Sequence, residues 1–369
     1  MAGARVELVL YDNRYDGKSK PSHLLYRSAT ALNLSSRVGS LVPASTRPWL
    51  AGDREAWLLQ QLPTVEAHLA VLLDASDAIA FCGADEIEQK WRWLAGPGKI
   101  VVGAETQMWP EETWFSIGGQ KTRLNVGPST KGAYPTAPIG HIGRGWVGRK
   151  MGTPFRYLNI GLLAGAPADL LSLLRCMDRM YQGFPRQCPV GRWPNGTWEY
   201  VSDAPHRTRF GLLSGHWGWE QSCFHYYLMQ QTFSQLDSRC PQLVPDFSAE
   251  LVFNSVKSLD YLTLPTNGTR PHINAKAPSL HGVRPCIVHA NSAAKPVLPV
   301  LQTYWERFAA PTAKATDDPL ARPVPPSKAE LMQLVERDWR PDDNAAARTL
   351  NPRHVAQFLK LFDRTGPAP

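Results

Sequence analysis

The chain has 369 residues, 43% of them hydrophobic and 13 of them Trp, so it can bury a large core and is not a disordered protein. Its net charge of +8 favours anionic partners, but the basic residues are scattered, which argues against a nucleic-acid-binding arm. No segment has the apolar length of a transmembrane helix, and no signal peptide precedes the first predicted strand. We therefore expect a cytoplasmic or cytosol-like protein without membrane attachment.

The cysteines support the same expectation, because they are widely spread and form no Cys-x-x-Cys pair. They are predicted to be reduced and mostly structural. The six are Cys82, Cys176, Cys188, Cys223, Cys240 and Cys286. Three glycosylation sequons, at Asn33, Asn195 and Asn267, are interpreted as chance matches in the absence of a secretory signal.

Alternating strand and helix patterns in the first third of the chain predict an α/β fold with a mixed, mostly parallel central sheet. The predicted elements are strands at Arg5–Tyr11 and Val38–Val42, a helix at Gly52–Leu62, a strand within Val71–Phe81, a helix at Ala84–Leu94 and a strand at Lys99–Ala104. Such a sheet binds ligands beyond the carboxyl ends of its strands.

The remainder of the chain returns to the core between two irregular insertions, Phe115–Pro154 and Gln182–Gly218. Its predicted elements are a strand in Arg156–Gly165, helices at Pro167–Tyr181 and Glu220–Phe233, mixed strand and turn at Leu243–Phe253, and a short strand at Cys286–Val288. We expect a main domain at residues 1–310, a Pro/Ala-rich linker at 311–327 and a helical tail at 328–369.

The apolar run that begins at Val71 ends in Asp74, and a second carboxylate, Asp77, follows after two small residues. Two carboxylates at the end of a buried strand supply charge and oxygen ligands for a hard cation such as Mg²⁺ or Mn²⁺. The structural alternative is an Asp-rich turn in which Asp74 caps the next helix.

Five stretches follow one another in the order of a known family. They are Leu-Asp-Ala-Ser-Asp-Ala (Leu73–Ala78), Ala-Glu-Thr-Gln-Met-Trp-Pro (Ala104–Pro110), Tyr-Leu-Asn-Ile-Gly-Leu (Tyr157–Leu162), Glu-Gln-Ser-Cys-Phe (Glu220–Phe224) and Val-His-Ala-Asn-Ser-Ala-Ala-Lys (Val288–Lys295). Together they resemble the glycosyltransferase domain of procollagen lysyl hydroxylases and, more distantly, the collagen galactosyltransferases, over about residues 5–308.

This resemblance implies a GT-A (Rossmann-like) nucleotide-sugar fold and transfer of glucose or galactose from a UDP-sugar with Mn²⁺, or Mg²⁺, as cofactor. The acceptor would be a hydroxylysine-type side chain, a sugar on protein, or a glycan. Because no oxygenase domain follows, lysyl hydroxylase activity is not expected. No specific nucleic acid or membrane partner is expected, and a homo-oligomer is left open.

The resemblance also implies a metal site formed by Asp74, Asp77 and His289, with Lys295 pairing with the donor phosphates. Taken alone, a strand-end His is more often a structural hydrogen-bonding residue, and Lys295 could be a solvated surface lysine. Arg54 would take the place of a phosphate-side lysine and Trp57 that of a family tryptophan. The alternative for Trp57 is ordinary core packing.

Other matched positions are expected around the donor and the acceptor. Trp109 would lie beside the donor sugar, and Asn159 would contact sugar hydroxyls, with Gly161 allowing close backbone approach; the alternatives are a packed Trp and a turn asparagine. Glu220 is the acidic residue expected on the acceptor side. Asn291 and Ser292 are expected along the pyrophosphate path.

Several positions depart from the family pattern. Ser76 stands where the family has a tyrosine that stacks on uracil, the acidic run before the glutamine is reduced to Trp219-Glu220, and Ala290 and Ser292 replace glycines. A second interpretation is therefore a catalytically weak relative that binds nucleotide-sugar or glycan without transfer, and a third is a basic nucleic-acid-binding protein. We expect the two insertions to form a rim that closes over the donor, the alternative being surface decoration.

Overall fold

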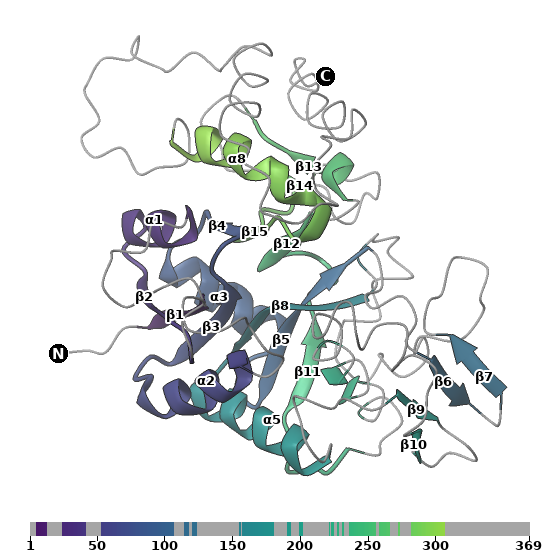
Figure 1. Cartoon of the computed structure of the whole chain (residues 1–369). Helices are drawn as coiled ribbons and strands as arrows, with labels where there is room; N and C mark the ends of the chain where they lie inside the picture. The colour runs from purple at the N-terminus through teal and green to yellow at the C-terminus, as the bar shows by residue number, and fades with distance from the viewer. Residues whose placement is uncertain are drawn as a thin grey trace, which may run out of the picture.

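Six strands form the central sheet of the computed structural model (Figure 1). Their order across the sheet is β11 (Gln242–Pro245), β5 (Lys99–Glu105), β8 (Tyr157–Gly165), β3 (Leu69–Asp74), β1 (Val6–Tyr11) and β2 (Ser35–Gly39). All neighbouring strands pair in parallel except β8, which runs antiparallel to both β3 and β5. The predicted α/β class with a mixed, mostly parallel sheet is therefore confirmed.

The structure describes the sheet, the helices that cover it and the strands that close one end of it. The described residues are 5–12, 24–41, 53–106, 114–117, 120–123, 155, 157–180, 190–192, 199–201, 221, 223–224, 227–228, 231, 236–255, 258–265, 272–273 and 282–306. Structural statements below refer to these residues.

Alternation along β1 and β3 sends side chains to opposite faces of the sheet, and both faces are buried. On one face, Leu8 and Leu10 pack in a cluster with residues of α1 (Leu24–Ala31) and α3 (Ala84–Leu94). On the other, Val9 and Leu72 belong to a cluster with residues of α2 (Asp53–Gln61) and α5 (Pro167–Met180). The result is a three-layer arrangement in which helices cover both faces of the sheet (Figure 1).

A second, three-stranded sheet lies beyond the carboxyl end of β3 (Figure 1). In it β15 (Ile287–His289) pairs in parallel with β12 (Val252–Asn254) and antiparallel with β4 (Ala78–Ala80). The backbone N–H of Ala290 donates to the carbonyl of Asp77 at 2.6 Å. This small sheet brings the late His289 next to the early Asp77, more than 200 residues away along the chain.

The structure corrects several sequence-based boundaries. The second strand covers Ser35–Gly39 and not Val38–Val42, and the stretch Val71–Phe81 is broken after Asp74 into two strands. Because β4 follows that break, Asp74 does not cap a helix; the N-cap of α3 is Gly83. The short strand near residue 286 begins and ends one residue later than predicted.

The two insertions were expected to lack periodic structure, and this expectation is wrong where the structure describes them. The first contains the hairpin of β6 (Trp114–Ile117) and β7 (Gln120–Arg123), and the second contains that of β9 (Val190–Arg192) and β10 (Glu199–Val201). Two helices, α1 and α8 (Leu298–Tyr304), were not predicted at all. The predicted linker and tail lie outside the described residues.

The prediction of reduced cysteines is also wrong. Cys82 is bonded to Cys286 and Cys176 to Cys240, with Cα atoms 4.7 and 5.9 Å apart, and Cys223 is disulfide-bonded as well. The first bond links Cys82, two residues after β4, to Cys286, the residue before β15. It therefore ties together two strands of the small sheet. Among the described helices, none combines the length and the hydropathy needed to cross a bilayer.

Candidate metal centre

Asp74 ends β3 at the topological switch point of the central sheet, and Asp77 follows in the turn before β4. Asp74 is the last residue of β3 and pairs in register with Tyr11, the last residue of β1. From β1 the chain moves outward to β2, whereas from β3 it moves to the opposite side, to β5. Strand ends at such a point border the crevice in which α/β proteins bind ligands.

His289 completes a cluster with these two carboxylates. The potential ligand atoms of Asp74, Asp77 and His289 all lie within 4.8 Å of one another. His289 Nε2 is 3.4 Å from Asp77 Oδ1, yet both atoms are buried and neither has a hydrogen-bond partner among the described residues. Buried polar atoms without partners are rare and require an explanation.

A divalent cation would satisfy both of these atoms. Adjacent ligands of an ion with bonds of about 2.2 Å lie about 3 Å apart, close to the observed Nε2–Oδ1 separation. Two carboxylates and an imidazole form a donor set that suits Mn²⁺. The side chain of Asp74 is 40% exposed, so the cluster is open to solvent on that side, where further ligands could bind.

Asp77 and His289, the two buried members of the cluster, each stabilise the charged form of the other. Burial alone would raise the pKa of Asp77, but the nearby His289 and Lys295 outweigh it and lower that pKa. Burial alone would lower the pKa of His289, but the negative charge of Asp77 outweighs it and raises that pKa. A cation that binds here therefore competes with the proton on Nε2.

Two side-chain cations flank the cluster. Arg54 of α2 lies 3.4 Å from Asp74 Oδ1 and also contacts Glu55 at 2.8 Å. Lys295 Nζ lies 3.4 Å from Asp77 Oδ2, and its side chain is 41% exposed. Lys295 is thus not an isolated surface lysine. Each of the two basic side chains thus lies 3.4 Å from a carboxylate oxygen of the cluster.

Beside the cluster lies a buried carboxylate that the sequence did not single out, that of Glu105 at the end of β5. It accepts hydrogen bonds from Asn159 Nδ2 at 3.0 Å, Gln221 Nε2 at 3.0 Å and Asn291 Nδ2 at 3.1 Å. Burial raises the pKa of Glu105 to about 7, although the three amide donors act in the opposite direction. This network joins three of the five motif stretches to β5.

Asn159 and Gly161 have different surroundings from those predicted. Asn159 lies within β8 and is buried, so it is not a turn asparagine; its Oδ1 accepts the N–H of Gly161 at 2.8 Å. The space beside Gly161 is filled by His289, since a Cβ built on the glycine would lie 2.1 Å from His289 Cε1. Close approach at Gly161 therefore serves the imidazole.

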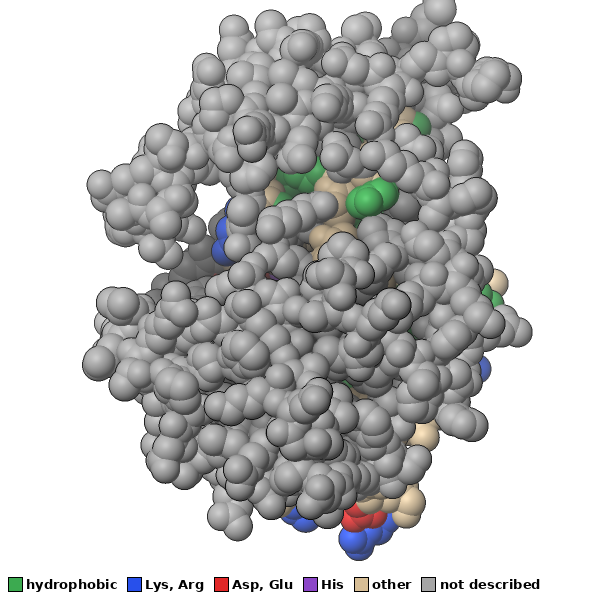
Figure 2. Space-filling view, turned by 90° about the vertical axis from the view of Figure 1, so that its right-hand side faces the viewer, with side chains coloured by type: hydrophobic (Ala, Val, Ile, Leu, Met, Phe, Trp, Pro, Cys, Tyr) green, Lys and Arg blue, Asp and Glu red, His purple; other side chains and the backbone are tan. Residues whose placement is uncertain are grey.

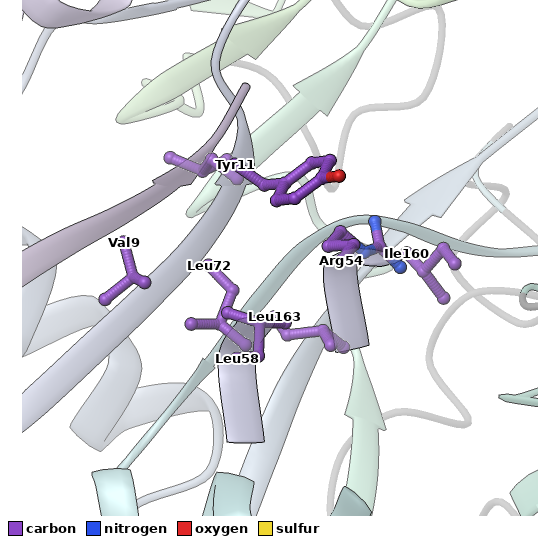
Figure 3. A pocket seen from close by; sticks show the side chains of 8 residues that line it. Val9, Tyr11, Arg54, Leu58, Leu72, Ile160 and Leu163 are labelled. Atoms are coloured by element: carbon purple, nitrogen blue, oxygen red, sulfur yellow. The ribbon is translucent and has the colours of Figure 1, made fainter. Parts of the chain in front are cut away.

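Trp57 is a core residue in this structure. It is 5% exposed and its ring lies 5.8 Å from that of Tyr11. Figure 3 shows a pocket with Tyr11 on one side and Arg54 and Ile160 on another. The rest of the lining is aliphatic and the cavity has room for about one water molecule, so it is not a phosphate site. Ser76, in the turn between the two metal-site aspartates, is half-buried.

Three predicted site residues cannot be placed here. Trp109 and Glu220 lie outside the described residues, and of Ser292 only the backbone is described, at the start of a 3₁₀ segment at Ser292–Val297. The structure thus brings together Asp74, Asp77, His289, Arg54 and Lys295, and beside them Asn159 and Asn291. Comparison with known proteins adds no relative, since no family model and no curated protein matches the chain.

Proposed function

We propose that this chain is a metal-dependent glycosyltransferase of the GT-A type that transfers a hexose, glucose or galactose, from a UDP-sugar to a hydroxyl-bearing acceptor. The observation that carries the proposal is the convergence of Asp74, Asp77 and His289 at the switch point, flanked by Arg54 and Lys295. A cation and two basic side chains in one crevice match a pyrophosphate.

In this proposal Asp74, Asp77 and His289 would hold Mn²⁺, which when bound neutralises charge on the departing UDP. Arg54 and Lys295 bind phosphate oxygens as fixed charges. The bond between the sugar and the β-phosphate oxygen breaks, a glycosidic bond to the acceptor oxygen forms, and the hydroxyl proton is released. Glu105 and its three amide partners hold the rim of the crevice in one arrangement.

The acceptor is proposed from the family resemblance alone, as a hydroxylysine-type side chain, a protein-linked sugar or a glycan. The disulfides alter the proposed location of the protein. Because such bonds persist in oxidising compartments, we propose a secretory or extracellular environment in place of a cytosolic one. The exposed turn position of Asn33, within a glycosylation sequon, is compatible with that environment.

The decisive experiment combines binding with turnover. Calorimetric titration of UDP, UDP-glucose and UDP-galactose, with and without Mn²⁺, tests the donor site. UDP release with and without hydroxylysine peptides and their galactosylated forms tests transfer. Metal-dependent binding with acceptor-stimulated UDP release supports the proposal, and an absence of metal-dependent nucleotide binding overturns it.

A binder without transferase activity is the second candidate, favoured by Ser76 in place of an aromatic base platform. It would show metal-dependent UDP-sugar binding with no acceptor-stimulated release. Nucleic-acid binding is less well supported. The Lys and Arg residues are scattered along the sequence and form no basic block (those that the structure describes on one face are blue in Figure 2).

A further inference from the structure

We propose that Asn254 is a positioning residue that fixes the tautomer and the ring orientation of His289, so that Nε2 presents its lone pair to the cation; this rests on the metal site of the proposed function. Asn254 lies in none of the five stretches that resemble the family, and its importance emerges only from the fold.

The two residues face each other across neighbouring strands. Asn254 ends β12, His289 ends β15, and the two are register partners. Asn254 Oδ1 lies 2.7 Å from His289 Nδ1, and Asn254 is fully buried while His289 is 2% exposed. Because both side chains are buried, solvent water does not compete for this hydrogen bond.

The direction of this hydrogen bond follows from the second contact of the amide. Asn254 Nδ2 donates to the carbonyl of Ala104 at 2.8 Å, and a carbonyl can only accept. The amide nitrogen must therefore point toward Ala104, which leaves the amide oxygen toward His289. Since an oxygen can only accept, Nδ1 of His289 must carry a hydrogen, and the neutral ring then has its lone pair on Nε2.

The hydrogen bond to Asn254 opposes turning the ring over, and the backbone of His289 is held separately. The imidazole lies against Gly161, where a Cβ would be 2.1 Å from Cε1 and 2.6 Å from Nδ1. The carbonyl of His289 is held by the N–H of Ser255 at 3.0 Å and by its hydroxyl at 2.9 Å. A flipped ring would place a carbon opposite Asn254 Oδ1 and lose the 2.7 Å bond.

Metal-binding histidines depend on such partners, and removing a partner of this kind typically weakens metal affinity by about 10–100-fold. Asn254→Leu, close in size, removes the acceptor for Nδ1–H. Asn254→Asp keeps an acceptor there, but it loses the donor to Ala104 and adds a negative charge beside the ring. Ser255→Ala is the matched control, because it removes a bond to the His289 backbone and leaves the ring contacts unchanged.

Two measurements test the inference. The first is the ¹⁵N spectrum of histidine-labelled, metal-free protein at alkaline pH, with the His289 signals assigned by His289→Gln. Wild type, Asn254→Asp and Ser255→Ala should show the Nδ1–H tautomer, whereas Asn254→Leu should show a mixture. The second is Mn²⁺ affinity by calorimetry, where Asn254→Leu should lose about 10–100-fold and Asn254→Asp should recover most of that loss.

An Nε2–H tautomer in the wild type would overturn the inference even if Asn254→Leu did not fold, and so would wild-type Mn²⁺ affinity in a folded Asn254→Leu protein. A wild type that binds no Mn²⁺ but shows the Nδ1–H tautomer would instead refute the proposed function and leave the role of Asn254 in orienting the ring intact.

Discussion

The imidazole of His289 occupies the space that a side chain at Gly161 would need, with Cε1 only 2.1 Å from the position of a built Cβ. A glycine in β8 of the central sheet thus leaves the space that His289 of the small sheet occupies. The first prediction follows, because even one methyl group at Gly161 must move His289, a proposed metal ligand.

We expect Gly161→Ala to displace His289, to weaken Mn²⁺ binding beyond detection in calorimetry, and to cost about 1–3 kcal/mol of unfolding free energy through overpacking. The matched control is Gly165→Ala on the same strand, where a Cβ would meet Ile100 Cγ1 at 3.0 Å, away from the cluster. The control should lose stability but bind Mn²⁺ normally. Equal metal affinity in both variants would contradict the assignment of His289.

Asp74→Asn should separate metal binding from stability. Its side chain is 40% exposed, so the change should alter the unfolding free energy by less than about 1 kcal/mol, while Mn²⁺ affinity should fall by more than about 100-fold. Calorimetry and chemical unfolding measure the two quantities. Asp85→Asn, whose side chain is 87% exposed, is the control and should change neither. Tight Mn²⁺ binding by Asp74→Asn would remove this carboxylate from the site.

The buried Glu105 predicts a pH dependence of stability. Its pKa of about 7 in the folded protein exceeds the ordinary 4.5, so the native state holds the proton more tightly. The contribution is full below about pH 4.5 and is lost as pH rises to about 7, by a total of about 3 kcal/mol. Urea unfolding between about pH 4 and pH 8 measures it.

In Glu105→Gln this slope should disappear, so the difference between wild-type and variant stability should change with pH across that window. Other groups cancel in the difference. Glu66→Gln, at an exposed position, should instead give a curve parallel to wild type. Parallel curves for Glu105→Gln would show that the three amide donors hold Glu105 ionised.

The two disulfides should differ in what they support. Replacing Cys82 and Cys286 by Ser should cost about 2–5 kcal/mol and weaken Mn²⁺ affinity, because the bond ties β4 to β15 beside Asp77 and His289. Replacing Cys176 and Cys240 removes no contact of the cluster, so Mn²⁺ affinity should persist. The second pair spans 64 residues and the first 204, so its loss should cost about 1 kcal/mol less.

The sequence predicted the central strands and the carboxylates that follow β3 for a physical reason, whereas His289 was added to them only by the family resemblance. Asp74 follows a continuous apolar run, and such runs become buried strands whose ends border ligand crevices. β2 was misplaced because it lies at the edge of the sheet, where Ser35 is exposed and no hydrophobic alternation marks the strand. Helix α1 lacks an acidic residue in its first turn, one of the signals by which helix starts are recognised.

The residues that surround the cluster could not be predicted in the same way. Glu105 and Asn254 acquire their roles from partners 54 to 186 and 35 to 150 residues away, and nothing in the neighbouring sequence indicates those contacts. The disulfides span 204 and 64 residues without a local spacing motif. Trp57 has helix periodicity that fits both packing and ligand binding, and only its burial in the structure selects packing.

Because β15 lies late in the sequence, the residues of the cluster are synthesised at very different times. Asp74 and Asp77 emerge early, but His289, its partner Asn254 and the antiparallel β8 that separates β3 from β5 follow much later. Until about residue 290 has left the exit tunnel, the nascent chain exposes two carboxylates and an unpaired β4 edge. During synthesis the β4 edge and the thiol of Cys82 therefore have to wait for the segment that carries β15 and Cys286.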